Sequence, residues 1–218
     1  IVGDLVAVAE PEGTARLFVE NPGADLPSKR PGKLDVGGLV GTDGVVRVIK
    51  DMGLKQPFIG SVPLQSGEIA DDIAYYLLLS EQIPSIVALG VLVDKDLSVL
   101  AAGGLLIQAL PGASDDKLAW IEERVNSIGA LSSLVKDHEL EAILSMIMGD
   151  SFEVLERLPL AFCCRCSQEK VEAIIRTLPD EEVSLSLQEL GMIEVRCNFC
   201  NDTYTFNKDK IDAIRINP

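Results

Sequence analysis

Four of the five cysteines fall into two short motifs whose residue type and spacing suit a metal ion. Cys164 and Cys166 form a C-x-C pair, and Cys197 and Cys200 form a C-x-x-C pair further along the chain. Each motif can present two thiolates to one cation from a tight turn. Four thiolates complete the tetrahedral coordination that Zn²⁺ prefers. We therefore predict one zinc site made by all four of these cysteines.

A zinc site of this kind can be purely structural or can act as a redox switch. Structural zinc contributes roughly 10–16 kcal/mol of apparent binding free energy at neutral pH, which is enough to fold a small module. Oxidation of the thiolates to disulfides would release the metal, and the stabilisation would be lost with it. Pairing within each motif is the expected connectivity because each partner is already nearby. The residues permit such a switch but do not require one.

Other reactive residues do not combine into a recognisable catalytic site. Cys163 would be redundant in a tetrahedral site, and we interpret it as a locally packed passenger. His138, the only histidine, lies in a charged stretch that we expect at a solvated helix start. No Ser/His/Asp or Cys/His combination is evident, and the glycine pairs fit neither a dinucleotide fingerprint nor a P-loop. We therefore expect the protein not to be an enzyme.

The charge of the chain argues against nucleic acid and membranes as partners. Its 218 residues carry a formal net charge of -15, which repels phosphate backbones and anionic lipid surfaces. One uncharged window, residues 97–114, contains glycines and a proline, and we interpret it as a buried strand and a turn rather than a membrane span. Free thiols without a secretory signal favour a reducing cytoplasm.

The first half of the chain alternates between strand and helix patterns. We predict a hairpin from residues 1–8 and 15–20, an exposed loop over residues 21–33, and strands at residues 45–49 and 58–64. A helix capped by Ser66 should follow and stop before Pro84. A second hairpin, from residues 86–93 and 98–109, is so uniformly apolar that we expect it to be buried on both faces.

Helical periodicity begins after Pro111. One predicted helix is capped by Ser114, and a second ends at Gly149. Both carry an apolar stripe and an acidic opposite face, and residues 111–163 contain ten acidic and four basic residues, a net charge of -6. Periodicity alone favours a helical subdomain packed on the sheet. The apolar positions are Leu118, Ile121, Val125, Ile128, Leu140, Ile143, Leu144 and Ile147, and Phe152, Leu155 and Leu158 extend the series.

The cysteine motifs belong to the last quarter of the chain. Ser167 should cap a helix whose inner face holds Val171, Ile174, Ile175 and Leu178, so the C-x-C pair would precede a helix N-terminus, a position that favours thiolate. Residues 192–196 and 203–206 should form a hairpin with the C-x-x-C pair at its tip. The fold class is thus α+β, with a mostly antiparallel sheet core, packed helices, a helical linker and a small C-terminal zinc-binding domain. We predict a core over residues 1–110, an acidic helical linker over 111–163 and a zinc-binding domain over 164–218.

The motifs together resemble one known family. Phe-Cys-Cys-Arg-Cys-Ser at residues 162–167, Cys-Asn-Phe-Cys at 197–200 and Tyr-Thr-Phe at 204–206 are similar to the zinc-binding part of the 33 kDa chaperonin family, bacterial redox-regulated heat-shock holdases. The run at residues 66–76, with residues 80–82, 101–104 and 108–112, resembles the core signature of that family. The resemblance covers essentially the whole chain.

The resemblance implies a chaperone that needs no ATP and is inactive when reduced and zinc-bound. Oxidation assisted by heat would release zinc, form the disulfides Cys164–Cys166 and Cys197–Cys200, and unfold the linker. The chaperone would then bind unfolding client proteins, often as a homodimer. On this view the acidic helices are only conditionally packed, and their release exposes their apolar faces. The expected metal ligands and redox-active residues are Cys164, Cys166, Cys197 and Cys200.

Two departures from the family and two competing functions accompany this interpretation. Family members begin several strands before the position of Ile1, which implies an N-terminally incomplete core, and Cys163 is additional to the usual four cysteines.

One alternative is a structural zinc-ribbon protein that binds a macromolecular partner. The other is a thiol-disulfide oxidoreductase using Cys197 and Cys200, although no thioredoxin-like βαβ pattern surrounds them.

Overall fold

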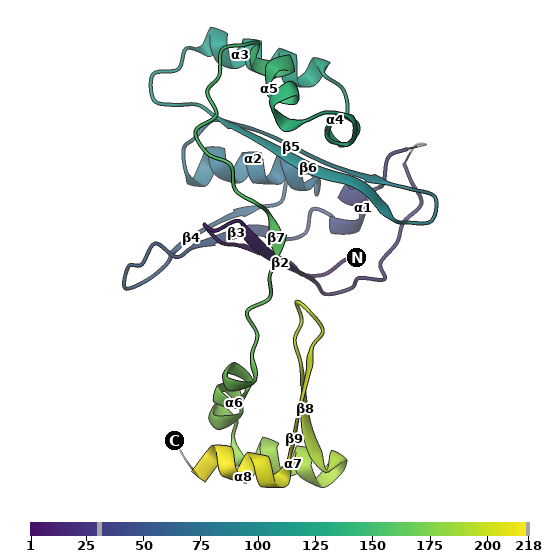
Figure 1. The fold of residues 1–218 in the computed structure, drawn as a ribbon, viewed down its shortest axis with the longest axis vertical. Coiled ribbons are helices and arrows are strands. Elements are labelled where there is room, and N and C mark those ends of the chain that lie inside the picture. Colours follow the sequence, from purple (N-terminus) through teal and green to yellow (C-terminus); the bar gives the residue numbers. More distant parts are fainter. Residues whose placement is uncertain (30–31, 217–218) are drawn as a thin grey trace. The chain divides into compact units, whose positions relative to one another are not determined.

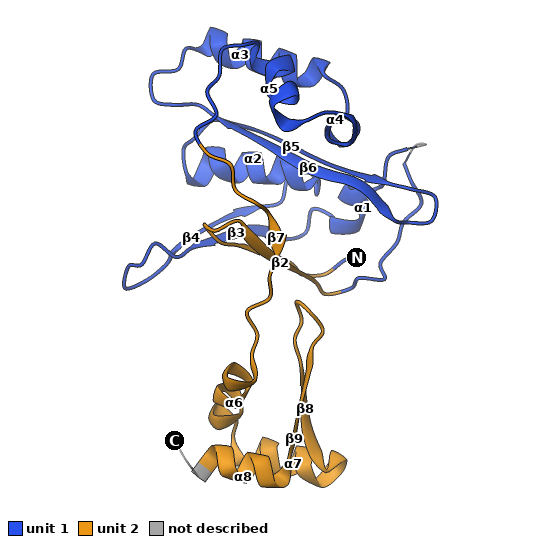
Figure 2. Ribbon diagram, in the orientation of Figure 1, with its two compact units in different colours: residues 1–2, 21–155 blue, residues 3–20, 156–218 orange. Residues whose placement is uncertain are grey.

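A computed structural model describes residues 1–29 and 32–216 and divides into two compact units. Unit 1 contains residues 1–2 and 21–155, and unit 2 contains residues 3–20 and 156–218 (Figure 2). The secondary structure is α+β, as predicted, with small sheets and mostly antiparallel pairing. The predicted three-part division at residues 110 and 163 concerns independent folding and stays a prediction.

Unit 1 stacks two hairpins on either side of one helix (Figure 1). Strands β3 (Val45–Lys50) and β4 (Phe58–Pro63) form the first antiparallel hairpin, and β5 (Ser85–Val93) and β6 (Val99–Gln108) form the second. Helix α2 (Ile69–Ser80) contacts β4 and β5. A short helix, α1 (Val36–Val40), precedes the first hairpin. The predicted strands and the predicted helix before Pro84 are therefore confirmed.

A buried carboxylate organises the start of α2. Asp72 is 1% exposed and accepts hydrogen bonds from the backbone N–H groups of Gln65, Ser66 and Gly67, at 2.7, 3.1 and 2.9 Å. These bonds satisfy the buried charge and hold the loop that leads into the helix. The predicted cap at Ser66 is wrong, because the N-cap residue is Glu68 and Ser66 instead accepts the N–H of Glu68 through its hydroxyl.

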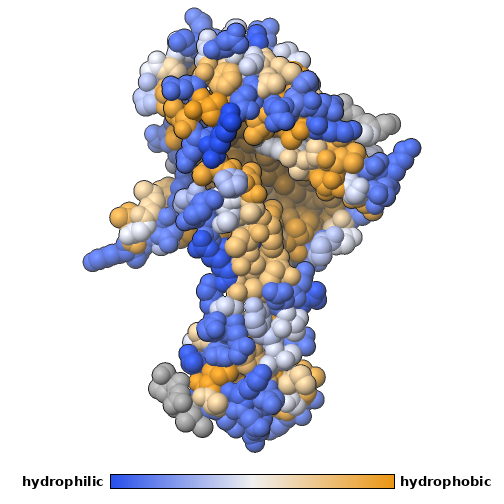
Figure 3. All heavy atoms as spheres, in the orientation of Figure 1, coloured by the Kyte–Doolittle hydropathy of each residue, from blue (hydrophilic) through white to orange (hydrophobic). Residues whose placement is uncertain are grey.

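The apolar hairpin β5–β6 is not buried on both faces. Along β6 the side chains alternate between exposed and half-buried, and Leu89, Val91 and Leu106 are each at least 50% exposed. The prediction of a fully buried hairpin is therefore wrong. A continuous apolar run has the same sequence pattern whether one face or both faces are covered. Figure 3 shows hydrophobic side chains gathered over this hairpin.

Three helices follow, and one of them was not predicted. Helices α3 (Asp115–Ser127) and α5 (Leu140–Met148) match the two predicted amphipathic helices, and α5 ends at Gly149 as expected. Helix α4 (Leu131–Asp137) lies between them and contacts both β5 and β6. Residues 151–160 contain neither helix nor strand, so the apolar series beyond Gly149 does not continue α5. The shared core of these helices is formed by Leu131, Ile143 and Ile147.

Two strand glycines allow α4 to approach the hairpin closely. Gly90 and Gly103 are paired across β5 and β6. A Cβ at Gly90 would lie 2.6 Å from the backbone nitrogen of Ser132, and one at Gly103 would lie 2.7 Å from Cγ2 of Val135. Such contacts are far inside van der Waals distance, so these positions need glycine while α4 stays docked.

Unit 2 begins with a three-stranded sheet in the order β1–β2–β7. Strands β1 (Leu5–Ala9) and β2 (Thr14–Val19) form the predicted antiparallel hairpin, and β7 (Ala161–Phe162) pairs parallel to β2. Gly13, with φ of +83°, lies where a Cβ would be 2.3 Å from the carbonyl oxygen of Pro159. Only glycine fits both this backbone conformation and this close approach.

The remainder of unit 2 is a small module of helices and an antiparallel hairpin, with its own core. It contains α6 (Gln168–Thr177), α7 (Asp180–Leu190), the hairpin of β8 (Met192–Arg196) and β9 (Thr203–Asn207), and α8 (Lys208–Ile216). Ser167 caps α6 by accepting the N–H of Lys170, as predicted, but Ile174 is 54% exposed and not on the inner face. The buried core residues are Val171, Ile175, Val183, Ile193, Phe206, Ile211 and Ile214.

We expect Gly90→Ala to loosen α4 from the β5–β6 hairpin. The added methyl group meets the backbone of Ser132, which cannot rotate away, and overpacking of this kind costs about 1–3 kcal/mol. Amide hydrogen exchange in residues 131–137 should accelerate. Gly104→Ala is the matched control, because its methyl group would press only on the flexible end of Leu89, at 2.9 Å, and would lie at an ordinary 3.7 Å from the carbonyl oxygen of Ala88. Equal exchange in the two variants would contradict the proposed docking constraint.

Candidate metal centre

The C-x-x-C motif is positioned by the tip of the β8–β9 hairpin. The N–H of Cys197 donates to the carbonyl of Asp202 at 2.8 Å, and the N–H of Asn201 donates back to the carbonyl of Cys197 at 2.8 Å. Asn201 adopts a positive φ of 63°, a conformation that asparagine tolerates better than most residues. The tight turn directs both cysteine sulfurs of the motif to the same side.

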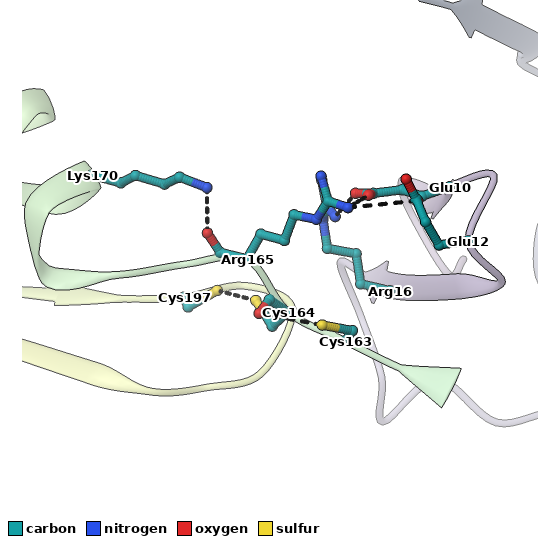
Figure 4. A network of polar contacts seen from close by, with 8 residues as sticks. All are labelled: Glu10, Glu12, Arg16, Cys163, Cys164, Arg165, Lys170 and Cys197. Atoms are coloured by element: carbon teal, nitrogen blue, oxygen red, sulfur yellow. Dashed lines mark hydrogen bonds and ion pairs between the residues drawn. The ribbon is translucent and has the colours of Figure 1, made fainter. Parts of the chain in front are cut away.

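The C-x-C motif lies between strand β7 and helix α6. The N–H of Cys163 donates to the carbonyl of Ala15 at 3.0 Å, which fixes the chain as it enters the motif. At the other end, the Ser167 cap starts α6, and the ammonium group of Lys170 donates to the carbonyl of Arg165 at 2.5 Å. Figure 4 shows the contact between Lys170 and Arg165 beside Cys164. The motif is thus held at both ends and through its middle residue.

The four predicted cysteines converge. Their Sγ atoms all lie within 4.8 Å of one another, with Cys164 3.5 Å from Cys197 and Cys166 3.3 Å from Cys200. These distances exceed the roughly 2.05 Å of a disulfide bond, and all four thiols are free. Four sulfurs bound tetrahedrally at about 2.3 Å from zinc lie about 3.8 Å apart. The donor set and its spacing therefore fit one zinc-sized, thiophilic cation.

The same distances leave the disulfide connectivity open. Since every pair among the four sulfurs lies within 4.8 Å, a neighbour within the motif is not clearly favoured over one in the other motif. The S···S contacts of 3.5 Å between Cys164 and Cys197 and of 3.3 Å between Cys166 and Cys200 both join the C-x-C motif to the C-x-x-C motif. Pairing of Cys164 with Cys166 and of Cys197 with Cys200 stays a prediction.

Protonation is uneven across the cluster. Burial opposes the thiolate of Cys197, but the backbone N–H groups of Cys200 and Phe199 and the neighbouring thiols lower its pKa to about 7. At Cys164 the N–H of Cys166 lowers the pKa, yet burial and contacts with the Cys166 and Cys197 thiols outweigh it, and the pKa rises. That the position before the N-terminus of α6 favours thiolate in the C-x-C motif stays a prediction. Binding of a cation would have to displace protons from the cluster.

A tyrosine that sequence reasoning missed as a site residue contacts the cluster. The hydroxyl of Tyr204, on β9, donates to the sulfur of Cys166 at 3.2 Å, and this hydrogen bond raises the tyrosine pKa. Phe206, two residues further on the same strand face, is buried in the module core. The period-two pattern of β9 could have placed Tyr204 beside the core, but not beside a sulfur.

Comparisons with known proteins place the chain in a family. The sequence profile described as Hsp33 protein matches residues 1–207. The chain belongs to the Hsp33 family. It is 41% identical to the 33 kDa chaperonin of Bacillus subtilis strain 168, over 98% of this chain and 74% of that protein. It is 44% identical to the 33 kDa chaperonin of Desulforamulus reducens, over 98% of this chain and 73% of that protein.

A solved Hsp33 structure confirms the fold. The crystal structure of the 33 kDa chaperonin from Thermotoga maritima superposes with a TM-score of 0.88 at 37% identity, covering 97% of this chain and 72% of that one. The resemblance drawn from the cysteine motifs and the core signature is thereby confirmed. Membership of the Hsp33 family supports a chaperone role.

Neither Cys163 nor His138 contributes to the cluster in this Hsp33 chain. Cys163 is exposed and its sulfur reaches only the carbonyl of Cys164, at 4.0 Å. His138 is exposed at the boundary between α4 and α5. Within residues 1–29 and 32–216, the four clustered cysteines are the one group of potential ligands that meets the geometry of a metal site. None of the helices in those residues has the length and apolar character to cross a bilayer.

We expect Tyr204→Phe to weaken metal binding by the reduced protein. The change removes one O–H···S hydrogen bond and leaves the ring in place, and loss of such an outer partner lowers metal affinity by about 10- to 100-fold. Competition between the reduced protein and a chromophoric zinc chelator would measure the affinity. Tyr75→Phe, in unit 1, provides the matched control. Equal affinities for the two variants would show that the Tyr204 hydroxyl does not support the site.

Proposed function

We propose that this protein is a redox-regulated holdase that works without ATP and binds Zn²⁺ through Cys164, Cys166, Cys197 and Cys200 when reduced. In this state it is inactive. Oxidation together with heat forms two disulfides, releases zinc, unfolds the helical linker and produces a chaperone, expected to be a homodimer, that holds unfolding proteins. The observation that carries the proposal is the convergence of four free thiols within 4.8 Å in a chain of the Hsp33 family.

The thiol chemistry of the proposed switch is balanced by a peroxide oxidant. Each cysteine pair gives up two electrons to hydrogen peroxide and becomes a disulfide, while the peroxide is reduced to two molecules of water when two thiol protons are also taken up. Bound zinc would hold the two motifs together and keep their sulfurs as thiolates. Disulfide sulfurs are poor ligands, so the two motifs lose their common cation. The small module then depends on its seven-residue buried core alone.

The helical segment before the motifs has the features of a conditionally stable region. Helix α3 has no buried residue, and Trp120 is 45% exposed. Its clearest tie to α5 is Arg124, which stacks on Trp120 at 5.0 Å and donates to the carbonyls of Met146 and Ile147 at 2.6 and 2.5 Å. Few buried apolar contacts and an excess of acidic charge both lower the free energy of local unfolding.

Unfolding of that segment would supply apolar surface for clients. It would expose the buried Leu131, Ile143 and Ile147, and it would uncover the face of β5–β6 on which α4 packs. The opposite face of that hairpin already presents Leu89, Val91 and Leu106. Large contiguous apolar patches are typical of sites that bind other proteins. Unfolded clients expose the complementary apolar segments.

The redox dependence is tested by aggregation of a heat-unfolding client enzyme, followed by light scattering. Protein treated with hydrogen peroxide and warmed should suppress aggregation, and reduction should abolish the effect, because only the oxidised form lacks its folded linker. Zinc release, far-ultraviolet circular dichroism and sedimentation should be followed on the same sample. Equal suppression by the reduced and oxidised forms would refute the proposed switch.

Cys163→Ser and Cys197→Ser form a matched pair for the same assay. Cys163 is exposed and outside the cluster, so its variant should bind about one zinc per chain and switch normally. Cys197→Ser removes one of the four clustered sulfurs and should lose most of the zinc affinity in the reduced state. Normal zinc content in Cys197→Ser, or loss of zinc in Cys163→Ser, would contradict the ligand assignment.

A further inference from the structure

The β1–β2 hairpin contacts one residue between the two cysteines of each motif. Arg165 lies between Cys164 and Cys166, and its guanidinium forms an ion pair with Glu10. Phe199 lies between Cys197 and Cys200, and the guanidinium of Arg16 stacks on its ring at 5.3 Å from the centroid. All of these residues belong to unit 2. One hairpin thus reaches both halves of the metal centre.

The two contacts are linked to each other through Glu10. Arg16 donates to Oε1 of Glu10 at 2.9 Å, while Arg165 contacts Oε2 of the same carboxylate. Figure 4 shows Arg16 and Arg165 side by side at this carboxylate. The side chain of Glu10 is 13% exposed and that of Arg16 is 21% exposed, so water screens their ion pair only weakly, whereas Arg165 is 53% exposed and its contact with Glu10 is screened more strongly. The result is a continuous chain from Phe199 through Arg16 and Glu10 to Arg165.

Backbone hydrogen bonds place this chain of contacts at a defined register. The N–H of Ala161 donates to the carbonyl of Gly13, and the N–H of Cys163 donates to that of Ala15, both at 3.0 Å. Strand β7 therefore enters the C-x-C motif already aligned along β2. The paired residues of β7 lie beside Thr14 and Ala15, next to the turn that carries Glu10, and Arg165 follows only three residues after this paired segment. A flexible surface ion pair would have no such support.

We propose that the β1–β2 hairpin is a clasp that positions the two cysteine motifs against each other, so that the hairpin and the metal centre become ordered together. Glu10, Arg16, Arg165 and Phe199 are positioning residues, because they act through the backbone between the cysteines and touch no sulfur. This inference deepens the proposed function by naming a structural link between the thiol cluster and the N-terminal hairpin. It rests on the proposed function only for the identity of the metal.

The expected effect of breaking the clasp is moderate. Partners that hydrogen-bond directly to metal ligands change metal affinity by about 10- to 100-fold, and Glu10 acts one step further out, so we expect zinc transfer to a chelator to accelerate about three- to tenfold. Glu10→Gln should produce this change in the reduced protein of residues 1–218. Amide exchange should also rise in both motifs and in residues 5–19. Arg165→Gln should have a similar effect, and the double variant should add little.

Glu12→Gln is the matched control for the clasp. Glu12 lies on the same turn, but its carboxylate is 3.7 Å from Arg165 and 67% exposed, so solvent screens the contact. The variant makes the same change of charge as Glu10→Gln and should leave zinc transfer and motif exchange as in the unmodified protein. Phe199→Leu, which keeps an apolar side chain without the cation–π contact, should cause a smaller acceleration than Glu10→Gln.

The outcomes separate the clasp from the proposed function. If Glu10→Gln and Glu12→Gln have equal exchange in the motifs and equal zinc transfer, or if the effects of Glu10→Gln and Arg165→Gln are fully additive, the clasp is wrong even though the protein switches. If the unmodified protein binds no zinc, the proposed function fails, whereas the clasp is still judged by motif exchange in the reduced variants. Faster amide exchange in the cysteine motifs of Glu10→Gln, but not in those of Glu12→Gln, supports the clasp in either case.

Discussion

Convergence of four thiols within a few ångströms is the constraint on which the C-terminal part of the molecule depends. Cys164 and Cys197 are 33 residues apart in sequence, so their sulfurs meet only if α6 and the β8–β9 hairpin are both folded and packed on one core. The convergence is costly without a cation, because neighbouring thiolates repel one another. Despite burial, backbone N–H groups and neighbouring thiols lower the pKa of Cys197 to about 7, whereas burial and neighbouring thiols outweigh the N–H of Cys166 and raise the pKa of Cys164. The fold thus builds a site whose stability depends on the ionic state of its sulfurs.

Two arginines tie helices α6 and α8 of unit 2 together. Arg215, on α8, donates to the carbonyls of Ile175 and Leu178 at 3.3 and 3.0 Å, and Arg176, on α6, donates to the carbonyl of Ile214 at 3.1 Å. These reciprocal bonds satisfy helix-end carbonyls and tie the two helices together. The cap residue of α6, Ser167, directly follows Cys166. A movement of Cys166 would therefore reach α6 directly through the backbone. The core beyond it is held by contacts that do not involve sulfur.

Local patterns accounted for the elements that are long or have clear ends. The apolar period of α3 and α5, the Gly149 stop and the Ser167 cap were readable because each acts within one or two helical turns. Helix α4 was missed because its seven residues are too few to show a period. The parallel pairing of β7 with β2 was missed because it involves only two residues at opposite ends of the chain. Pairing over such a distance leaves no local signal.

In the candidate site, too, local patterns could be read from the sequence and long-range contacts could not. Cysteine type and spacing identified the four sulfurs that converge, because each motif supplies two of them locally. The hydrogen bond from Tyr204 and the ion pair between Glu10 and Arg165 were not predicted. Charged residues are frequent in this chain, and no spacing distinguishes the one glutamate that meets Arg165 from the others. Tertiary contacts of this kind require the fold before they can be assigned.

The order of the chain explains why weak contacts at the hairpin can matter. The chain leaves unit 2 after residue 20 and returns to it at residue 156, so Glu10 and Arg165 close a loop that includes residues 21–155 of unit 1. Closing a long loop costs conformational entropy, and that cost grows only slowly with length. The contacts that hold this loop closed at the cysteine motifs are an ion pair, one cation–π contact and two strand hydrogen bonds. The hairpin contacts Arg165 and Phe199, and each of these residues lies between two of the clustered cysteines. A movement of either cysteine motif would therefore break a contact that holds the loop closed.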